Sequence, residues 1–113
     1  MARILIAEAD AKFRLVLEIV VCGLGHEPVV AGEDRRPGDV DVLVLEPNLP
    51  SALAIAWALR RKDPRLPIVF TSIRTATPDV LAFEPVAYLV KPFRLAELGQ
   101  ALEAAVAASG HTV

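Results

Sequence analysis

The sequence predicts an α/β fold in which helices cover both faces of a parallel sheet. Short β-branched-rich runs alternate along the chain with longer runs whose apolar residues recur at helical spacing. Alternating strands and helices imply parallel strands, because each helix carries the chain back to the same edge of the sheet. The chain has 113 residues, of which 54% are hydrophobic. We therefore expect a single domain with a large core.

The first predicted strand covers residues 3–7 (RILIA), a short apolar run. Asp10 can cap the next helix, predicted over residues 11–22, by accepting hydrogen bonds from its first backbone amides. Residues 27–31 (EPVVA) are predicted to form a second, weaker strand. The polar residues 32–39 contain glycine and proline, so we expect a loop or at most one helical turn there.

The clearest strand is predicted over residues 40–45 (VDVLVL). Ser51 can cap a helix over residues 52–62, which ends before Pro64. The other predicted elements are a strand at 67–71, a short helix at 79–84 opened by Pro78, a strand at 86–90 and a helix at 94–109, with Leu95, Leu98, Leu102, Ala105 and Val106 on one face.

Several polar side chains follow the carboxyl ends of these strands, where ligands bind in open parallel sheets. They are Glu8, Asp10, Glu46, Thr71, Ser72 and Lys91. Carboxylates grouped with a hydroxyl and a lysine can hold a divalent cation and a phosphoryl group. This edge of the sheet is therefore the candidate functional site.

Four segments carry a family resemblance: ILIAEAD at 4–10, DVLVLEPNLP at 41–50, IVFTS at 68–72 and YLVKPF at 88–93. In this order and spacing they resemble the receiver domain of two-component response regulators, the CheY-like family. The resemblance implies a flavodoxin-like doubly wound sandwich with a five-stranded parallel sheet of order 2-1-3-4-5. It also implies that the second helix is shortened or missing here, since residues 32–39 leave little room for one.

The resemblance assigns roles to the residues at the edge of the sheet. Glu46 stands at the position of the aspartate that accepts a phosphoryl group, and Glu8 at the first of two acidic positions that hold Mg²⁺. Thr71 and Lys91 match the residues that contact the phosphoryl oxygens, and Tyr88 matches the switch aromatic. The bond before Pro92 is expected to be cis.

Two positions depart from the family pattern. Glu46 replaces the aspartate, and its extra methylene moves the carboxylate outward by about 1.5 Å. Ala9 replaces the second acidic residue, and Asp10 is acidic but one residue further on. Mg²⁺ needs near-octahedral oxygen ligands, so we expect metal binding to be weak or lost, no other cofactor and no enzymatic activity. Glu8 and Asp10 would remain as an acidic pocket.

These departures predict an atypical stand-alone receiver that acts by protein contact without ordinary phosphorylation. Glu46 could hold an active-like state by reaching toward Lys91 and Thr71, or it could form a simple ion pair with Lys91. Two alternatives remain: a working phosphoacceptor despite Glu46 and Ala9, and a receiver fold that serves as a dimerisation or scaffold domain.

The expected partner is a protein such as a histidine kinase, a phosphotransfer protein or a downstream effector. Residues 52–59 (ALAIAWAL) carry almost no polar side chain, so Trp57 is an interface candidate and a homodimer is possible. With 12 basic and 14 acidic residues, the chain is not expected to bind nucleic acid. No apolar run is long enough to span a membrane.

The remaining expectations concern location and isolated side chains. A lone cysteine and the lack of a signal segment predict a cytoplasmic protein, and the length predicts no attached output domain. Cys22 is expected to be a buried small hydrophobe. His26 and His111 are expected at the surface, because neither has a second ligand at metal spacing.

Overall fold

The computed structural model describes residues 1–31 and 39–110. This part of the chain contains a five-stranded parallel sheet of order β2-β1-β3-β4-β5, which confirms the predicted fold and strand order. The strands are β1 (Arg3–Ala7), β2 (Glu27–Val30), β3 (Val42–Leu45), β4 (Ile68–Ser72) and β5 (Ala87–Val90). The central strands β1, β3 and β4 are almost wholly buried, because a parallel sheet is covered on both faces.

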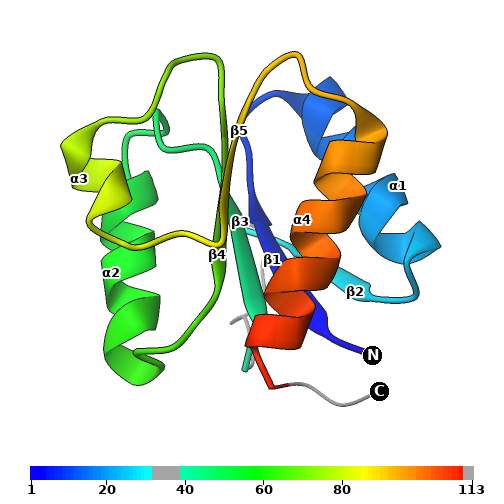
Figure 1. Cartoon of the computed structure of the whole chain (residues 1–113), viewed down its shortest axis with the longest axis horizontal. Coiled ribbons are helices and arrows are strands. Elements are labelled where there is room, and N and C mark those ends of the chain that lie inside the picture. The colour runs from blue at the N-terminus through cyan, green and yellow to red at the C-terminus, as the bar shows by residue number, and fades with distance from the viewer. Residues whose placement is uncertain (32–38, 111–113) are drawn as a thin grey trace.

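Four helices in the described residues form the two outer layers (Figure 1). Helices α1 (Ala11–Gly23) and α4 (Leu95–Ala108) cover one face, and α2 (Ala52–Lys62) and α3 (Pro78–Leu81) cover the other. Successive strand residues point to opposite faces. The sheet therefore separates two cores, the first holding Ile4, Ile6 and Val44 and the second Leu5, Leu43 and Leu45.

The helix ends follow local sequence, with one exception. The Asp10 carboxylate accepts hydrogen bonds from the backbone amides of Lys12 and Phe13, which confirms its predicted role as the cap of α1. The prediction for Ser51 was wrong, because its side chain makes no capping hydrogen bond to α2. Helix α3 begins at Pro78 but ends three residues earlier than predicted.

Burial corrects three expectations about single residues. Leu95, the first residue of α4, is 62% exposed, and Ala101 lies on the buried face instead. Cys22 is exposed, because the neighbouring Val21 points inward and one helical step rotates the side chain by about 100°. His26 is buried rather than at the surface, and its Nδ1 accepts a hydrogen bond from the Ala2 amide.

The connection between β2 and β3 was predicted to lack a full helix. Residues 32–38 of it, and likewise His111, lie outside the described residues, so the expectation for the second helix and for its face of the sheet stays a prediction. None of the helices within 1–31 and 39–110 has the length and apolar character needed to cross a membrane.

Candidate functional site

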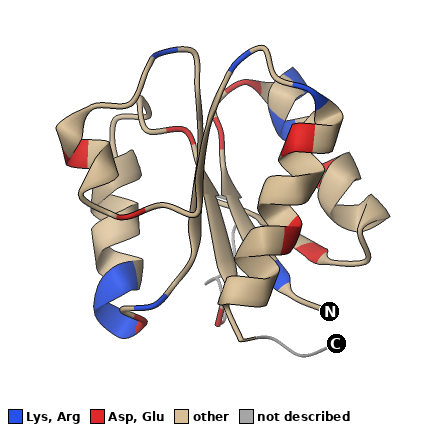
Figure 2. Cartoon of the chain, viewed as in Figure 1, with Lys and Arg blue, Asp and Glu red and all other residues tan. Residues whose placement is uncertain are grey.

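The loops after β1, β3, β4 and β5 meet at one end of the sheet, drawn at the top of Figure 1. Parallel strands place all their carboxyl ends at the same edge. Figure 2 shows that both acidic and basic positions occur on the chain at this end. The polar residues predicted from the sequence are therefore gathered in one region.

Three charged side chains form the centre of the site. Ala7 pairs with Leu45 across β1 and β3, so the residues that follow them, Glu8 and Glu46, are neighbours. Lys91 follows β5 and reaches back across β4, which places its Nζ 2.6 Å from Glu8 Oε1 and 3.5 Å from Glu46 Oε2. The three side chains are 3%, 10% and 16% exposed for Glu8, Glu46 and Lys91.

The second oxygen of each carboxylate accepts hydrogen bonds from the loop that follows its own strand. Glu8 Oε2 accepts a hydrogen bond from the Asp10 amide at 3.1 Å. Glu46 Oε1 accepts from the Asn48 amide at 3.0 Å and from Asn48 Nδ2 at 2.7 Å. Both carboxylates thus bond the backbone two residues further on and turn the other oxygen toward Lys91. One ammonium is shared by two fixed carboxylates.

Glu46 only partly meets the geometry predicted for it. Its carboxylate faces Lys91, but the shorter contact of Lys91 is with Glu8. Thr71 Oγ1 is buried and has no hydrogen-bond partner in the part of the chain that the structure describes. Glu46 therefore does not bond Thr71, because its remaining oxygen is held by Asn48.

Asp10 does not belong to the pocket, which corrects the expected acidic pair of Glu8 and Asp10. It is exposed, and its carboxylate is engaged at the start of α1. Ala9 offers no side-chain oxygen. Within residues 1–31 and 39–110, no three acidic, histidine or cysteine side chains are grouped to hold a metal ion. Glu8 and Glu46 are the carboxylates left to face a cation, and Lys91 lies against both.

Asn48 had no role in the sequence analysis, and Ser72 was named there only as a polar residue at the edge of the sheet. Asn48 Nδ2 donates to Ser72 Oγ at 2.9 Å, in addition to its bond with Glu46. Ser72 Oγ also accepts a hydrogen bond from the Arg74 amide at 3.1 Å. Asn48 could have been suspected, since asparagine between two prolines favours a turn with side-chain hydrogen bonds. Nothing in the sequence distinguishes Ser72 from Thr71 in this respect.

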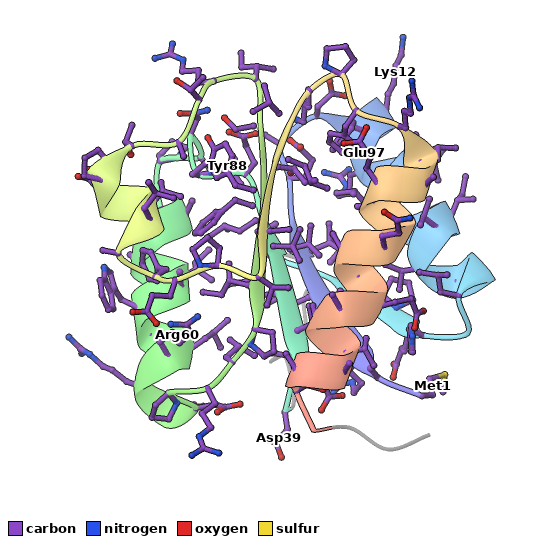
Figure 3. The ribbon with its side chains drawn as sticks, viewed as in Figure 1. Met1, Lys12, Asp39, Arg60, Tyr88 and Glu97 are labelled. Carbon is purple, nitrogen blue, oxygen red and sulfur yellow. The ribbon has the colours of Figure 1, made fainter. Side chains whose placement is uncertain are left out.

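Aromatic side chains border the site on both faces of the sheet. On one face, Lys91 Nζ lies 4.0 Å from the centre of the Phe13 ring. On the other, the Tyr88 hydroxyl donates to the Arg74 carbonyl at 2.7 Å, and Figure 3 shows Tyr88 near the loops at this end. The bond between Lys91 and Pro92 is cis, as the sequence led us to expect.

Trp57, the interface candidate, lies apart from these residues on α2. Its side chain is 51% exposed, and its ring packs at 4.3 Å between centroids against the buried Phe83. Beside it Ala54 and Ala58 are also exposed, so α2 presents an apolar strip to solvent. The packing fixes the indole without covering it.

Comparisons with known proteins bear on the sequence and the fold of the whole chain. No protein-family model matches the chain. The transcriptional regulatory protein PrrA of Mycobacterium tuberculosis is 34% identical over 100 residues, and so is PrrA of Mycobacterium bovis. The match covers 84% of this chain and 42% of PrrA, so the chain spans less than half of the length of these relatives.

Solved structures share the fold at lower identity. A CheY-like receiver domain protein from Methanospirillum hungatei superposes with a TM-score of 0.82 at 16% identity and covers 97% of both chains. The BeF3-activated DrrB receiver domain gives 0.81 at 16% identity, covering 95% of this chain and 98% of that one. NtrX from Brucella abortus gives 0.79 at 22%, with 96% of this chain and 27% of NtrX. The fold is therefore that of the CheY-like receiver domains, and the sequence is similar to part of PrrA.

Proposed function

We propose that this chain is an atypical receiver in two-component signalling that works through protein contact, without the ordinary phosphorylation cycle. The observation that carries the proposal is the position of Lys91 between Glu8 and Glu46, at 2.6 and 3.5 Å. A metal ion in this place would have to displace a buried ammonium and would then find two carboxylates. That set is poor for Mg²⁺, which prefers six oxygen ligands in strict geometry.

The contacts of Glu46 also disfavour a role for this residue as phosphoryl acceptor. Glu46 Oε1 accepts two hydrogen bonds from Asn48, and the other oxygen faces Lys91. An attack on a phosphoryl donor would require one oxygen to leave these partners, and misplacement by about 1 Å can slow a positioned reaction about a hundredfold. Without a metal ion, the charge on the transferred group would also be poorly neutralised.

In this proposal the shared ammonium keeps the loops in one arrangement that a partner recognises. The partner is a protein of the signalling pathway, such as a histidine kinase, a phosphotransfer protein or an effector. Glu46 imitates the phosphorylated state only in part, because one carboxylate carries less charge and fewer acceptor oxygens than a phosphoryl group. Trp57 on the exposed strip of α2 is a candidate contact for the partner or for a second copy.

The test is incubation with acetyl phosphate and Mg²⁺, followed by intact-mass analysis. The wild-type chain should gain no phosphoryl group and should show no Mg²⁺-dependent binding of beryllofluoride. The matched control is the double variant Ala9→Asp with Glu46→Asp, which rebuilds the family pattern and should gain activity in both assays. Stable incorporation into the wild type that is lost on Glu46→Gln would overturn the proposal.

One observation favours the alternative of a working phosphoacceptor. The buried Thr71 hydroxyl has no hydrogen-bond partner among the described residues, whereas buried polar groups in proteins are normally hydrogen-bonded. A phosphoryl oxygen at the site could accept a hydrogen bond from this hydroxyl. The same assay decides this alternative, with Thr71→Val expected to lower the incorporation if it occurs.

A further inference from the structure

The outer face of α2 changes from apolar to basic along the helix. Its apolar part is the exposed strip of Ala54, Trp57 and Ala58. The last turn carries three basic residues, and Figure 2 shows these positions gathered at the end of the helix. Trp57 and Arg61 are four residues apart and are therefore neighbours on the helix surface. A molecule that covers the indole also meets positive charge.

The fold uses one of these cations and leaves others to solvent. Arg60 Nε donates to the Leu66 carbonyl at 2.8 Å, so its guanidinium is engaged within the chain. Arg61, Lys62 and Arg65 are exposed, and none of them forms an ion pair within residues 1–31 and 39–110. Their charges are available to carboxylates of another molecule.

Trp57 is held in place before any partner arrives. One side of its ring packs on Phe83 at 4.3 Å between centroids, while about half of the side chain remains exposed. A side chain that is already fixed loses little conformational entropy when a partner covers it. Tryptophan and arginine are also enriched among the residues that contribute most to binding at protein interfaces.

A second copy of the chain does not supply charges that complement this face. In a two-fold contact each copy contributes the same patch. Parallel α2 helices would bring the two basic ends together. Antiparallel helices would bring each basic end to the first turn of the other α2, residues 52–55 (ALAI), which holds no acidic side chain and carries the positive end of the helix dipole. The occupant must therefore bring its own carboxylates.

A nucleic acid and an anionic membrane fit this face less well than an acidic protein segment. Duplex binders neutralise many phosphates, and clusters of about four to eight Lys or Arg are typical of lipid headgroup sites. The face offers three exposed cations, and the carboxylates of Asp63 and Glu84 lie close enough to Arg60 to interact with its charge. The whole chain carries a net charge of −2.

We propose that the outer face of α2 binds an acidic segment of a partner protein, which sets an apolar side chain against Trp57 and carboxylates against Arg61, Lys62 and Arg65. This binding site rests on the proposed function for the existence of a protein partner, and it deepens that function by naming the chemistry of the partner. The indole supplies the apolar contact, and the cations steer the encounter and fix the orientation.

The test is a binding titration with a defined peptide. The probe is a short peptide of Glu, Ala and Leu with its leucines at helical spacing, and the control peptide has Gln in place of every Glu. Trp57 is the only tryptophan, so the acidic peptide should shift its fluorescence emission to the blue as the indole loses contact with water. Fluorescence anisotropy of the fluorescein-labelled peptide gives the affinity, which should fall as salt is raised.

Variants separate the face from the net charge of the chain. The double variant Arg61→Gln with Lys62→Gln should weaken the binding about fivefold, the loss expected for two exposed ion pairs. Lys12→Gln with Arg94→Gln removes the same charge from exposed positions outside the face and should change the affinity by less than about twofold. Trp57→Ala should weaken the binding about thirtyfold, and Trp57→Phe should give a smaller loss in a chain that keeps an aromatic ring there. Circular dichroism checks that each variant is folded.

The proposal is overturned if the acidic peptide does not bind, if the glutamine peptide binds equally well, or if both double variants lose the same affinity. Tighter binding of oligo-dT, or of vesicles of phosphatidylserine and phosphatidylcholine in equal parts, would also overturn it, as would a dimer in analytical ultracentrifugation that is lost on Trp57→Ala. No phosphodonor is present in these experiments. Phosphoryl incorporation would refute the proposed function and leave the peptide affinity unaffected, whereas failed peptide binding leaves the phosphorylation test unchanged.

Discussion

Removal of the Lys91 ammonium is the sharpest test of the charged centre. Lys91→Met replaces the lysine by an uncharged side chain of similar length. Glu8 and Glu46, whose side chains are 3% and 10% exposed, then lose their shared cation. Loss of one partner from a buried ion pair destabilises a protein by about 3–5 kcal/mol. The 16% exposure of Lys91 and the 3.5 Å separation from Glu46 place the expected loss near the lower limit, about 3 kcal/mol.

The assay is urea unfolding followed by circular dichroism. The matched control is Lys12→Met, at an exposed position of α1, which should change the free energy of unfolding by less than about 0.5 kcal/mol. A loss below about 1 kcal/mol for Lys91→Met would refute the reasoning.

Three further predictions follow from the same contacts. Asp10→Ala should destabilise the chain by about 1 kcal/mol in urea unfolding, because it removes both hydrogen bonds at the start of α1; an unchanged midpoint would contradict this. Thr71→Val should raise stability by about 1 kcal/mol, since it replaces a buried hydroxyl that has no partner in the described chain; a clear loss would mean that the hydroxyl is satisfied in solution. Cys22 should react with Ellman's reagent in the native protein at the rate of an open thiol, since it is exposed; reaction only after unfolding would show that it is covered.

The elements of the fold could be predicted because their causes are local. The β-branched run at Arg3–Ala7, the helical spacing of α4 and the carboxylate of Asp10 each act over a few residues. Alternation of strands and helices then favours a parallel sheet. Cys22 and Leu95 were wrongly expected to be buried because both side chains are apolar. An apolar side chain does not by itself show which face of a helix packs against the sheet.

The sequence by itself placed Glu8, Glu46 and Lys91 at one edge of the sheet, since each follows a strand of one parallel sheet, but it placed Asp10 in the same pocket. Tertiary structure decided how they share their bonds. Lys91 must cross β4 to reach either carboxylate, so its closer partner depends on strand spacing and side-chain torsions that no local pattern encodes. The link from Asn48 to Ser72 joins residues 24 positions apart. It exists because β3 and β4 are adjacent, and adjacency is a property of the folded sheet rather than of either segment.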